Sequence, residues 1–141
     1  MSRTAISIIL ADDHQLIRKS WKTLLENNPG FTVVADCRNG ENVLECVKKH
    51  QPDILIVDIT LSPEEAFQIV SRITKEQPAV KIIGLSVNNQ PKYAVKMMAL
   101  GARGYITKTS SLEEITQGIT EVHNGNIFIC EEVQKLMPAG K

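Results

Sequence analysis

Asp53-Ile-Leu-Ile-Val-Asp-Ile-Thr, residues 53–60, is the stretch that decides the fold. Its run of aliphatic residues, several of them β-branched, is typical of a strand buried on both faces of a sheet. Asp58 interrupts this run near its end. Because a buried carboxylate without a partner is unfavourable, we expect Asp58 either to be neutralised or to lie at the strand mouth beside a counter-ion. By itself, Asp58 is equally compatible with an ordinary loop aspartate.

Similar apolar runs occur on both sides of this stretch, and helical patterns separate them. The predicted strands cover residues 6–11, 31–37, 54–58, 80–86 and 104–107. The segments that follow each strand carry apolar residues at helical spacing. Five strand–helix units in succession predict an α/β fold, with a parallel sheet that has helices on both faces.

Three helix boundaries carry recognisable signals. Ser62-Pro-Glu-Glu65 predicts a capping box, with Ser62 as the N-cap and the proline at the first helical position. Ser111 and Glu114 repeat the capping-box spacing. Gly101 follows an apolar helical pattern and is expected at a helix C′ position.

Composition restricts the functional classes. Lys plus Arg and Asp plus Glu both total 16, which argues against this chain holding nucleic acid by itself. Cys37, Cys46 and Cys130 form no C-x-x-C and are expected to be core thiols in a reducing compartment. No apolar run approaches the ~18 residues of a bilayer span. The N-terminus lacks a signal-peptide pattern, so we expect a cytoplasmic chain without membrane contact.

Polar side chains follow four of the predicted strands. They are Asp12 and Asp13, then Asp58, Ser86 and Lys108. In an open parallel sheet, ligand sites form beyond the carboxyl ends of the strands. Three neighbouring carboxylates repel strongly, which indicates a hard divalent cation, with Mg²⁺ the natural candidate. The hydroxyl and the ammonium can hold a phosphoryl group, and Asp58 suits the role of nucleophile.

Together these residues resemble the response-regulator receiver domain, the phosphoacceptor half of two-component signalling. The resemblance covers residues 6–125. Asp12-Asp-His14, Leu85-Ser-Val-Asn-Asn89 and Gly101-Ala-Arg-Gly-Tyr-Ile-Thr-Lys108 are most similar to the NarL/FixJ (LuxR-type) subfamily. The resemblance implies a flavodoxin-like (βα)5 three-layer sandwich, with five parallel strands in the order 2-1-3-4-5.

The resemblance also implies a role for each acidic residue. Asp58 would accept a phosphoryl group from the phosphohistidine of a sensor histidine kinase. Asp13, Asp58 and the backbone carbonyl of Thr60 would ligate Mg²⁺ directly, and Asp12 would act largely through water. Such a domain supports its own phosphorylation and dephosphorylation and is a signalling domain rather than an enzyme.

The remaining site residues would contact the phosphoryl group or change conformation in response to it. Ser86 and Lys108 would contact its oxygens, and Tyr105 matches the aromatic switch position whose rotamer follows the Ser86 hydroxyl. The face made by the fourth helix, fifth strand and fifth helix would then change a partner or homodimer surface. Subfamily members usually bind DNA through a C-terminal helix-turn-helix domain, which is not in this sequence.

The sequence continues past the end of the fifth strand–helix unit, and residues 126–141 are not needed to complete that unit. Ile127, Phe128 and Ile129 form a further apolar group, and a polar stretch follows it. We expect residues 1–125 to be the receiver domain. Residues 126–141 are expected to be a tail that begins the linker to an output domain.

Two departures from the receiver pattern stand beside the site. Leu61-Ser-Pro-Glu-Glu-Ala66 occupies the position where receivers usually show Met-Pro-x-Met-Asp-Gly, so this loop must be shaped differently. Thr109 stands where many receivers have a cis proline after the lysine. A cis bond before a residue other than proline costs ~3 kcal/mol, so we expect a trans Lys108–Thr109 bond.

Three alternatives stay open on the sequence alone. A degenerate receiver that docks partners without phosphorylation is compatible with the unusual 61–66 loop. An aspartyl-phosphate phosphatase of the haloacid-dehalogenase type would need Asp-x-Asp after the first strand, but Asp12 and Asp13 are adjacent. A flavodoxin-like FMN carrier would need a Ser/Thr/Gly-rich phosphate loop there, and two aspartates would repel phosphate.

Overall fold

Strands and helices alternate along the chain, as the apolar patterns predict. The computed structural model describes residues 5–12, 14–38, 41–59, 62–87 and 89–137. The strands are β1 (Ile6–Ala11), β2 (Phe31–Cys37), β3 (Ile54–Asp58), β4 (Lys81–Ser86), β5 (Gly104–Thr107) and β6 (Phe128–Ile129). The helices are α1 (Gln15–Glu26), α2 (Glu41–His50), α3 (Pro63–Glu76), α4 (Pro91–Ala99), α5 (Leu112–His123) and α6 (Glu131–Gln134).

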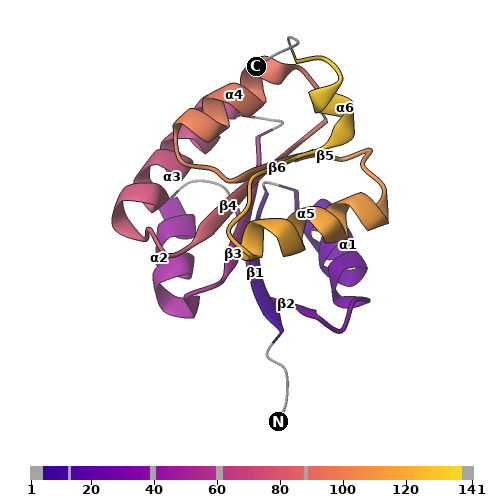
Figure 1. The fold of residues 1–141 in the computed structure, drawn as a ribbon. Helices are drawn as coiled ribbons and strands as arrows, with labels where there is room; N and C mark the ends of the chain where they lie inside the picture. Colours follow the sequence, from indigo (N-terminus) through magenta and orange to yellow (C-terminus); the bar gives the residue numbers. More distant parts are fainter. Residues whose placement is uncertain (1–4, 13, 39–40, 60–61, 88, 138–141) are drawn as a thin grey trace.

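The six strands that the structure describes form one parallel sheet in the order β2-β1-β3-β4-β5-β6. The first five confirm the predicted flavodoxin-like order 2-1-3-4-5. Helices α1 and α5 lie on one face of this sheet, and α2, α3 and α4 lie on the other (Figure 1). The order reverses between β1 and β3, which makes the carboxyl ends of these strands a topological switch point.

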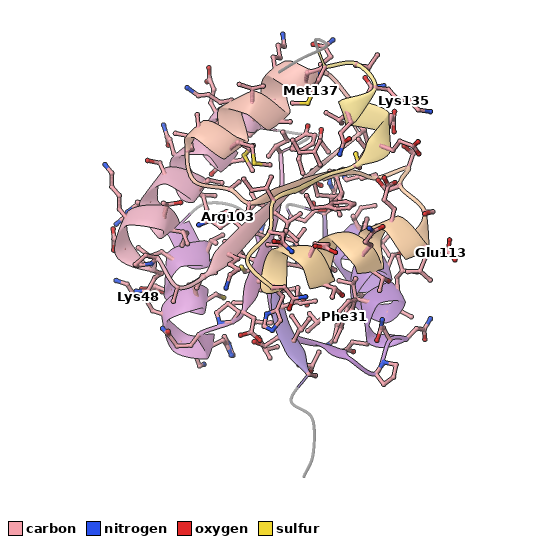
Figure 2. The ribbon with its side chains drawn as sticks, viewed as in Figure 1. Phe31, Lys48, Arg103, Glu113, Lys135 and Met137 are labelled. Carbon is pink, nitrogen blue, oxygen red and sulfur yellow. The ribbon has the colours of Figure 1, made fainter. Side chains whose placement is uncertain are left out.

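The central strand β3 lies at the middle of the core, and all five of its residues are buried. The core around it is mainly aliphatic, as the low aromatic content requires. Lys48 on α2 and Glu113 on α5 lie at the outer surface (Figure 2). The three cysteines are free thiols. None of the helices in the described part of the chain has the length and apolar character of a membrane span.

The helix boundaries follow the sequence signals with one exception. Ser111 accepts a hydrogen bond from the Glu114 backbone N–H at 3.1 Å, which confirms Ser111 as the N-cap of α5, while Glu114 Oε2 accepts from the Glu131 backbone N–H. Gly101 has φ +116°, the left-handed conformation expected at C′. The predicted capping box at Ser62 is wrong. Ser62 is the N-cap residue of α3, but its side chain makes no capping hydrogen bond. The first turn of α3 instead depends on Pro63 at its start and on a backbone bond from Ala66 N–H to the Ser62 carbonyl at 3.0 Å.

Residues 126–137, here called the C-terminal segment, form more structure than the sequence predicts. Phe128 and Ile129 pair with Gly104 and Tyr105 as strand β6, and helix α6 follows directly. The sheet therefore continues beyond residue 125, where we expected the receiver fold to end. A two-residue strand has too little local pattern to be recognised from sequence, because its pairing depends on the neighbouring β5.

Candidate functional site at the carboxyl edge of the sheet

The carboxyl ends of β1, β3, β4 and β5 meet at one edge of the sheet. Backbone hydrogen bonds hold these ends in register. They run from Asp12 N–H to the Cys37 carbonyl (3.0 Å), from Ile59 N–H to the Leu85 carbonyl (2.9 Å) and from Lys108 N–H to the Ser86 carbonyl (2.9 Å). The ladder thereby brings Asp12, Asp58, Ser86 and Lys108 to a common edge, as the sequence predicts.

Asp58 is the last residue of β3, and its carboxylate is almost completely buried. Lys108 Nζ lies 2.6 Å from Asp58 Oδ2. The lysine side chain is itself only 18% exposed, so water screens this ion pair weakly. The counter-ion expected beside Asp58 is therefore Lys108, contributed by the end of β5.

Asp12 is the second buried carboxylate of the site. Burial raises the pKa of Asp12 above its ordinary value, and the hydrogen bond with Asp58 raises it further. The His14 backbone N–H donates to Asp12 Oδ1 at 2.9 Å and acts in the opposite direction, as does the charge of Lys108. Two carboxylates in contact must share a proton or a cation, and this donor set fits a hard divalent cation.

Two of the predicted metal ligands, Asp13 and the carbonyl of Thr60, lie outside the described residues, as does Leu61 of the unusual loop. Within the described part of the chain, no three His, Cys, Asp or Glu side chains are grouped closely enough to hold a metal. Asp12 and Asp58 supply two oxygen donors. A magnesium site therefore requires further ligands from residues 13 and 60, or from water and phosphate.

Ser86 and Tyr105 form the hydroxyl part of the site. Both side chains are buried, and they lie on the neighbouring strands β4 and β5. Burial raises the pKa of Tyr105 to about 12, although its hydrogen bond with Ser86 acts in the opposite direction. The phenol therefore stays neutral at physiological pH and is in hydrogen-bond contact with the hydroxyl that the sequence assigns to the phosphoryl group.

Arg18 is a site residue that the sequence analysis missed. From the first turns of α1, its Nη1 donates to the Asp12 carbonyl at 2.6 Å, and its Nε lies 3.0 Å from Asp36 Oδ1. This guanidinium links the end of β1 to β2 and is 13% exposed. The sequence indicates only that Arg18 lies near the start of a helix. Its contacts with Asp12 and Asp36 depend on how α1 packs against the sheet, so no local signal reveals them.

The peptide bond between Lys108 and Thr109 is trans, as predicted. The loop after Lys108 also has a partner that the sequence does not indicate. Glu132 of α6 accepts hydrogen bonds from Thr107 and Thr109. No sequence signal identifies Glu132, because it comes from the segment that we expected to be a tail.

Comparison with known proteins now identifies the family. Residues 8–120 match the response regulator receiver domain, which is most of the chain. The chain is 31% identical over 133 residues to Transcriptional regulatory protein DegU of Brevibacillus brevis, covering 94% of this chain and 56% of that protein. It is 31% identical over 125 residues to Oxygen regulatory protein NreC of Staphylococcus epidermidis, covering 88% of this chain and 57% of that protein. The chain thus spans little more than half the length of these relatives.

Solved structures show the same fold. A two-component response regulator of the LuxR family from Aurantimonas sp. SI85-9A1 has a TM-score of 0.87 and 28% identity, with 94% of each chain covered. The isolated REC domain of RcsB from Salmonella enterica serovar Typhimurium, solved with the phosphomimetic BeF3⁻, has a TM-score of 0.84 and 21% identity. That comparison covers 96% of this chain and all of the other. The chain therefore belongs to the response regulator receiver domain family, within its NarL/FixJ (LuxR-type) subfamily.

Proposed function

We propose that this receiver domain is the phosphoacceptor of a two-component system and that Asp58 accepts the phosphoryl group. The observation that carries the proposal is the buried Asp58 carboxylate, with Lys108 Nζ at 2.6 Å and Asp12 in hydrogen-bond contact. A purely structural ion pair would not require a second carboxylate beside the first. Perturbed, buried acidic groups at a sheet edge are typical of functional sites.

The phosphoryl donor is the phosphohistidine of a sensor histidine kinase. A carboxylate oxygen of Asp58 attacks phosphorus, the bond between phosphorus and the imidazole nitrogen breaks, and the imidazole keeps the electron pair of that bond and takes up a proton. The product is an acyl phosphate on Asp58 and a free histidine. Lys108 then pairs with a phosphoryl oxygen in place of the carboxylate, and the Ser86 hydroxyl donates to another.

Asp12, Asp13, Asp58 and the carbonyl of Thr60 are the residues that would hold Mg²⁺. When bound, the cation neutralises the carboxylates and the phosphoryl oxygens during transfer. Arg18 supports this set by holding the Asp12 carbonyl at 2.6 Å. The chain's own contribution is to orient Asp58 and to place the Lys108 ammonium beside its carboxylate.

Phosphorylation would act on the β4–β5 side of the site. When Lys108 and Ser86 turn toward a new anion, the hydrogen bond between Ser86 and Tyr105 must change. Helix α4, which begins five residues after Ser86, and helix α5 would shift with these strand ends. The changed surface of α4, β5 and α5 would bind a partner or a second copy of the chain.

The output of this switch is proposed from the relatives. DegU carries the name of a transcriptional regulatory protein and is about twice as long as the matched region. We infer that a DNA-binding output domain belongs with this receiver in the cytoplasm, and that the C-terminal segment leads toward it. DNA would then be contacted by that domain and not by the receiver.

The test is covalent labelling by a small phosphodonor such as acetyl phosphate, with and without Mg²⁺. We expect Mg²⁺-dependent labelling of the wild type and none of Asp58→Asn. Asp53→Asn is the matched control, because Asp53 precedes the same strand at its opposite end and accepts a hydrogen bond from Ser7 that an asparagine oxygen can still accept. Undiminished labelling of Asp58→Asn would exclude Asp58 as the acceptor.

A further inference from the structure

The C-terminal segment is bound tightly to the edge of the sheet beside the candidate site (Figure 1). The backbone N–H of Phe128 donates to the Arg103 carbonyl and that of Cys130 to the Tyr105 carbonyl, both at 3.0 Å. Cys130 and Val133 are completely buried. Helix α6 contacts both β5 and α4, so the segment lies against the face through which the switch is proposed to act.

Glu132 is the polar anchor of this segment. Its Oε1 accepts hydrogen bonds from the Thr107 and Thr109 hydroxyls, each at 2.9 Å. Its Oε2 accepts a hydrogen bond from Asn89 Nδ2 at 2.9 Å. These bonds lower the pKa of Glu132, the contribution of Asn89 being the largest. The carboxylate is thus charged at neutral pH, and both of its oxygens accept hydrogen bonds.

The three donors lie next to the residues proposed to bind the phosphoryl group, at the carboxyl ends of β4 and β5. Thr107 and Thr109 flank Lys108 on both sides in the chain. Asn89 lies three residues after Ser86, in the connection between β4 and α4. One carboxylate from α6 therefore joins the loop after β4 to the loop after β5 at the site edge. The Thr107 side chain is buried, so its hydroxyl needs this acceptor or another.

We propose that Glu132 is a positioning residue that ties Ser86 and Lys108 to the C-terminal segment, so that phosphorylation of Asp58 and docking of this segment are energetically coupled. The inference rests on the proposed function. A shift of Lys108 or Ser86 toward a phosphoryl group displaces the donors of Glu132 and weakens the docking of α6. Coupling free energies are reciprocal, so loss of the Glu132 bonds makes phosphorylation at Asp58 more favourable.

The neighbouring Glu131 provides a matched control on the same helix. Its side chain is exposed, and its role in docking is carried by its backbone N–H, which donates to Glu114 Oε2 at 2.6 Å. Glu131→Ala therefore removes one negative charge from α6 and leaves the Glu132 bonds in place. Lys135, labelled in Figure 2, directly follows α6. It lines one hollow together with Glu131 and Glu132, and it is left unchanged in both variants.

The first test measures labelling of the 141-residue chain by acetyl phosphate in Mg²⁺. We expect Glu132→Ala to raise the initial rate about three- to tenfold, because the donors of Glu132 no longer have to be displaced, while Glu131→Ala stays near the wild-type rate. Glu132→Gln keeps an oxygen for the two hydroxyls but turns its amide toward Asn89, so it should recover part of the wild-type behaviour. A wild-type or lower rate in Glu132→Ala overturns the coupling. If the wild type is not labelled at all, the proposed function fails and this inference fails with it.

The second test measures amide hydrogen exchange of residues 128–136, with and without the phosphoryl mimic BeF3⁻. We expect faster exchange when the mimic binds the wild type and Glu131→Ala. Glu132→Ala should exchange faster already in the free state and show a smaller response. This difference separates coupling from a merely structural role, which would change the free state and leave the response intact. An unchanged response in a folded Glu132→Ala overturns the proposal, even if exchange in its free state is faster.

Discussion

The two flanks of the site are built on different principles. On the β1–β3 flank, two buried carboxylates, Asp12 and Asp58, are held in contact by strands inside the core. On the β4–β5 flank, Lys108, Ser86 and Tyr105 lie on or just after two neighbouring strands. Glu132 of α6 holds the residues next to them, Asn89, Thr107 and Thr109, with hydrogen bonds. The first flank is packed inside the core, and the contact between its two carboxylates is electrostatically unfavourable. The second supplies the compensating charge and is held by bonds that water can replace.

This difference predicts which flank would move in the proposed switch. A packed aliphatic strand such as β3 has no second arrangement of similar energy. Hydrogen bonds at the surface contribute modestly, because water can replace either partner. We therefore expect the acidic flank to keep its geometry when a ligand binds. The β4–β5 flank, together with the C-terminal segment, is expected to change.

The largest expected effect comes from removing the cation of the pair. Lys108→Met leaves the buried Asp58 carboxylate beside Asp12 without its counter-charge, so the free energy of unfolding should fall by about 3 kcal/mol. Urea unfolding followed by circular dichroism measures this change. Lys108→Arg keeps a positive charge and should lose less. If Lys108→Met were as stable as the wild type, the two flanks would not be electrostatically dependent on each other.

A second effect tests the packing between β4 and β5. A Cβ at Gly84 would lie 2.7 Å from Met97 Cε and 3.1 Å from Tyr105 Cδ1. Gly84→Ala should therefore lower the free energy of unfolding by about 1–3 kcal/mol and displace the Tyr105 ring. Thermal unfolding and the near-ultraviolet circular dichroism of Tyr105 measure these two changes.

A double-mutant cycle tests the origin of this overpacking. With Met97→Ala as the background, Gly84→Ala should be less destabilising, because the methionine end that it meets is absent. An equal loss in both backgrounds would contradict the contact with Met97 as the cause.

A smaller effect of opposite sign is expected on the acidic flank. The raised pKa of Asp12 means that its charge disfavours folding at neutral pH. Asp12→Asn should therefore raise the free energy of unfolding by about 1 kcal/mol and reduce Mg²⁺-dependent labelling. The control is Asp36→Asn, which removes an acid that is paired with Arg18 and should be slightly destabilising. A loss of stability in Asp12→Asn would mean that the carboxylate contact is favourable.

The smallest expected effect is a pH dependence of the C-terminal segment. The pKa of Glu132 lies below its ordinary value of 4.5, so its contribution to docking is present above about that pH and is lost as pH falls through the lowered pKa. Amide exchange of residues 128–136, corrected for intrinsic rates, should rise about two- to fivefold in this range.

The control for this pH dependence is Glu132→Gln. Glu114, Glu131 and Lys135 line the same hollow, so other charged groups face the Glu132 carboxylate. Glu132→Gln separates their contribution and should remove the acid-dependent step. If the step persists in Glu132→Gln, one of these other groups causes it.

The sequence predicts the strands well where their pattern is long. Residues 54–58 are predicted as a strand and form β3 with the same bounds, because a continuous aliphatic run has no alternative place outside the core. Asp58 is predicted to be functional because Asp12, Ser86 and Lys108 stand at other strand ends. The predicted capping bond at Ser62 fails because it depends on backbone conformation. Ser62 has φ −140° and ψ 82°, outside the extended region in which Ser111 forms its capping bond.

Sequence by itself determined the α/β architecture and which polar residues reach the functional edge, because hydrophobic period and strand ends are local properties of the chain. Only the tertiary structure decided the partners of those residues. The 2.6 Å contact from Lys108 to Asp58, the support of Asp12 by Arg18 and the three bonds of Glu132 each join segments that are distant in sequence or separated by a loop. Such contacts depend on the register of the sheet and on how the helices pack against it, which no local pattern encodes.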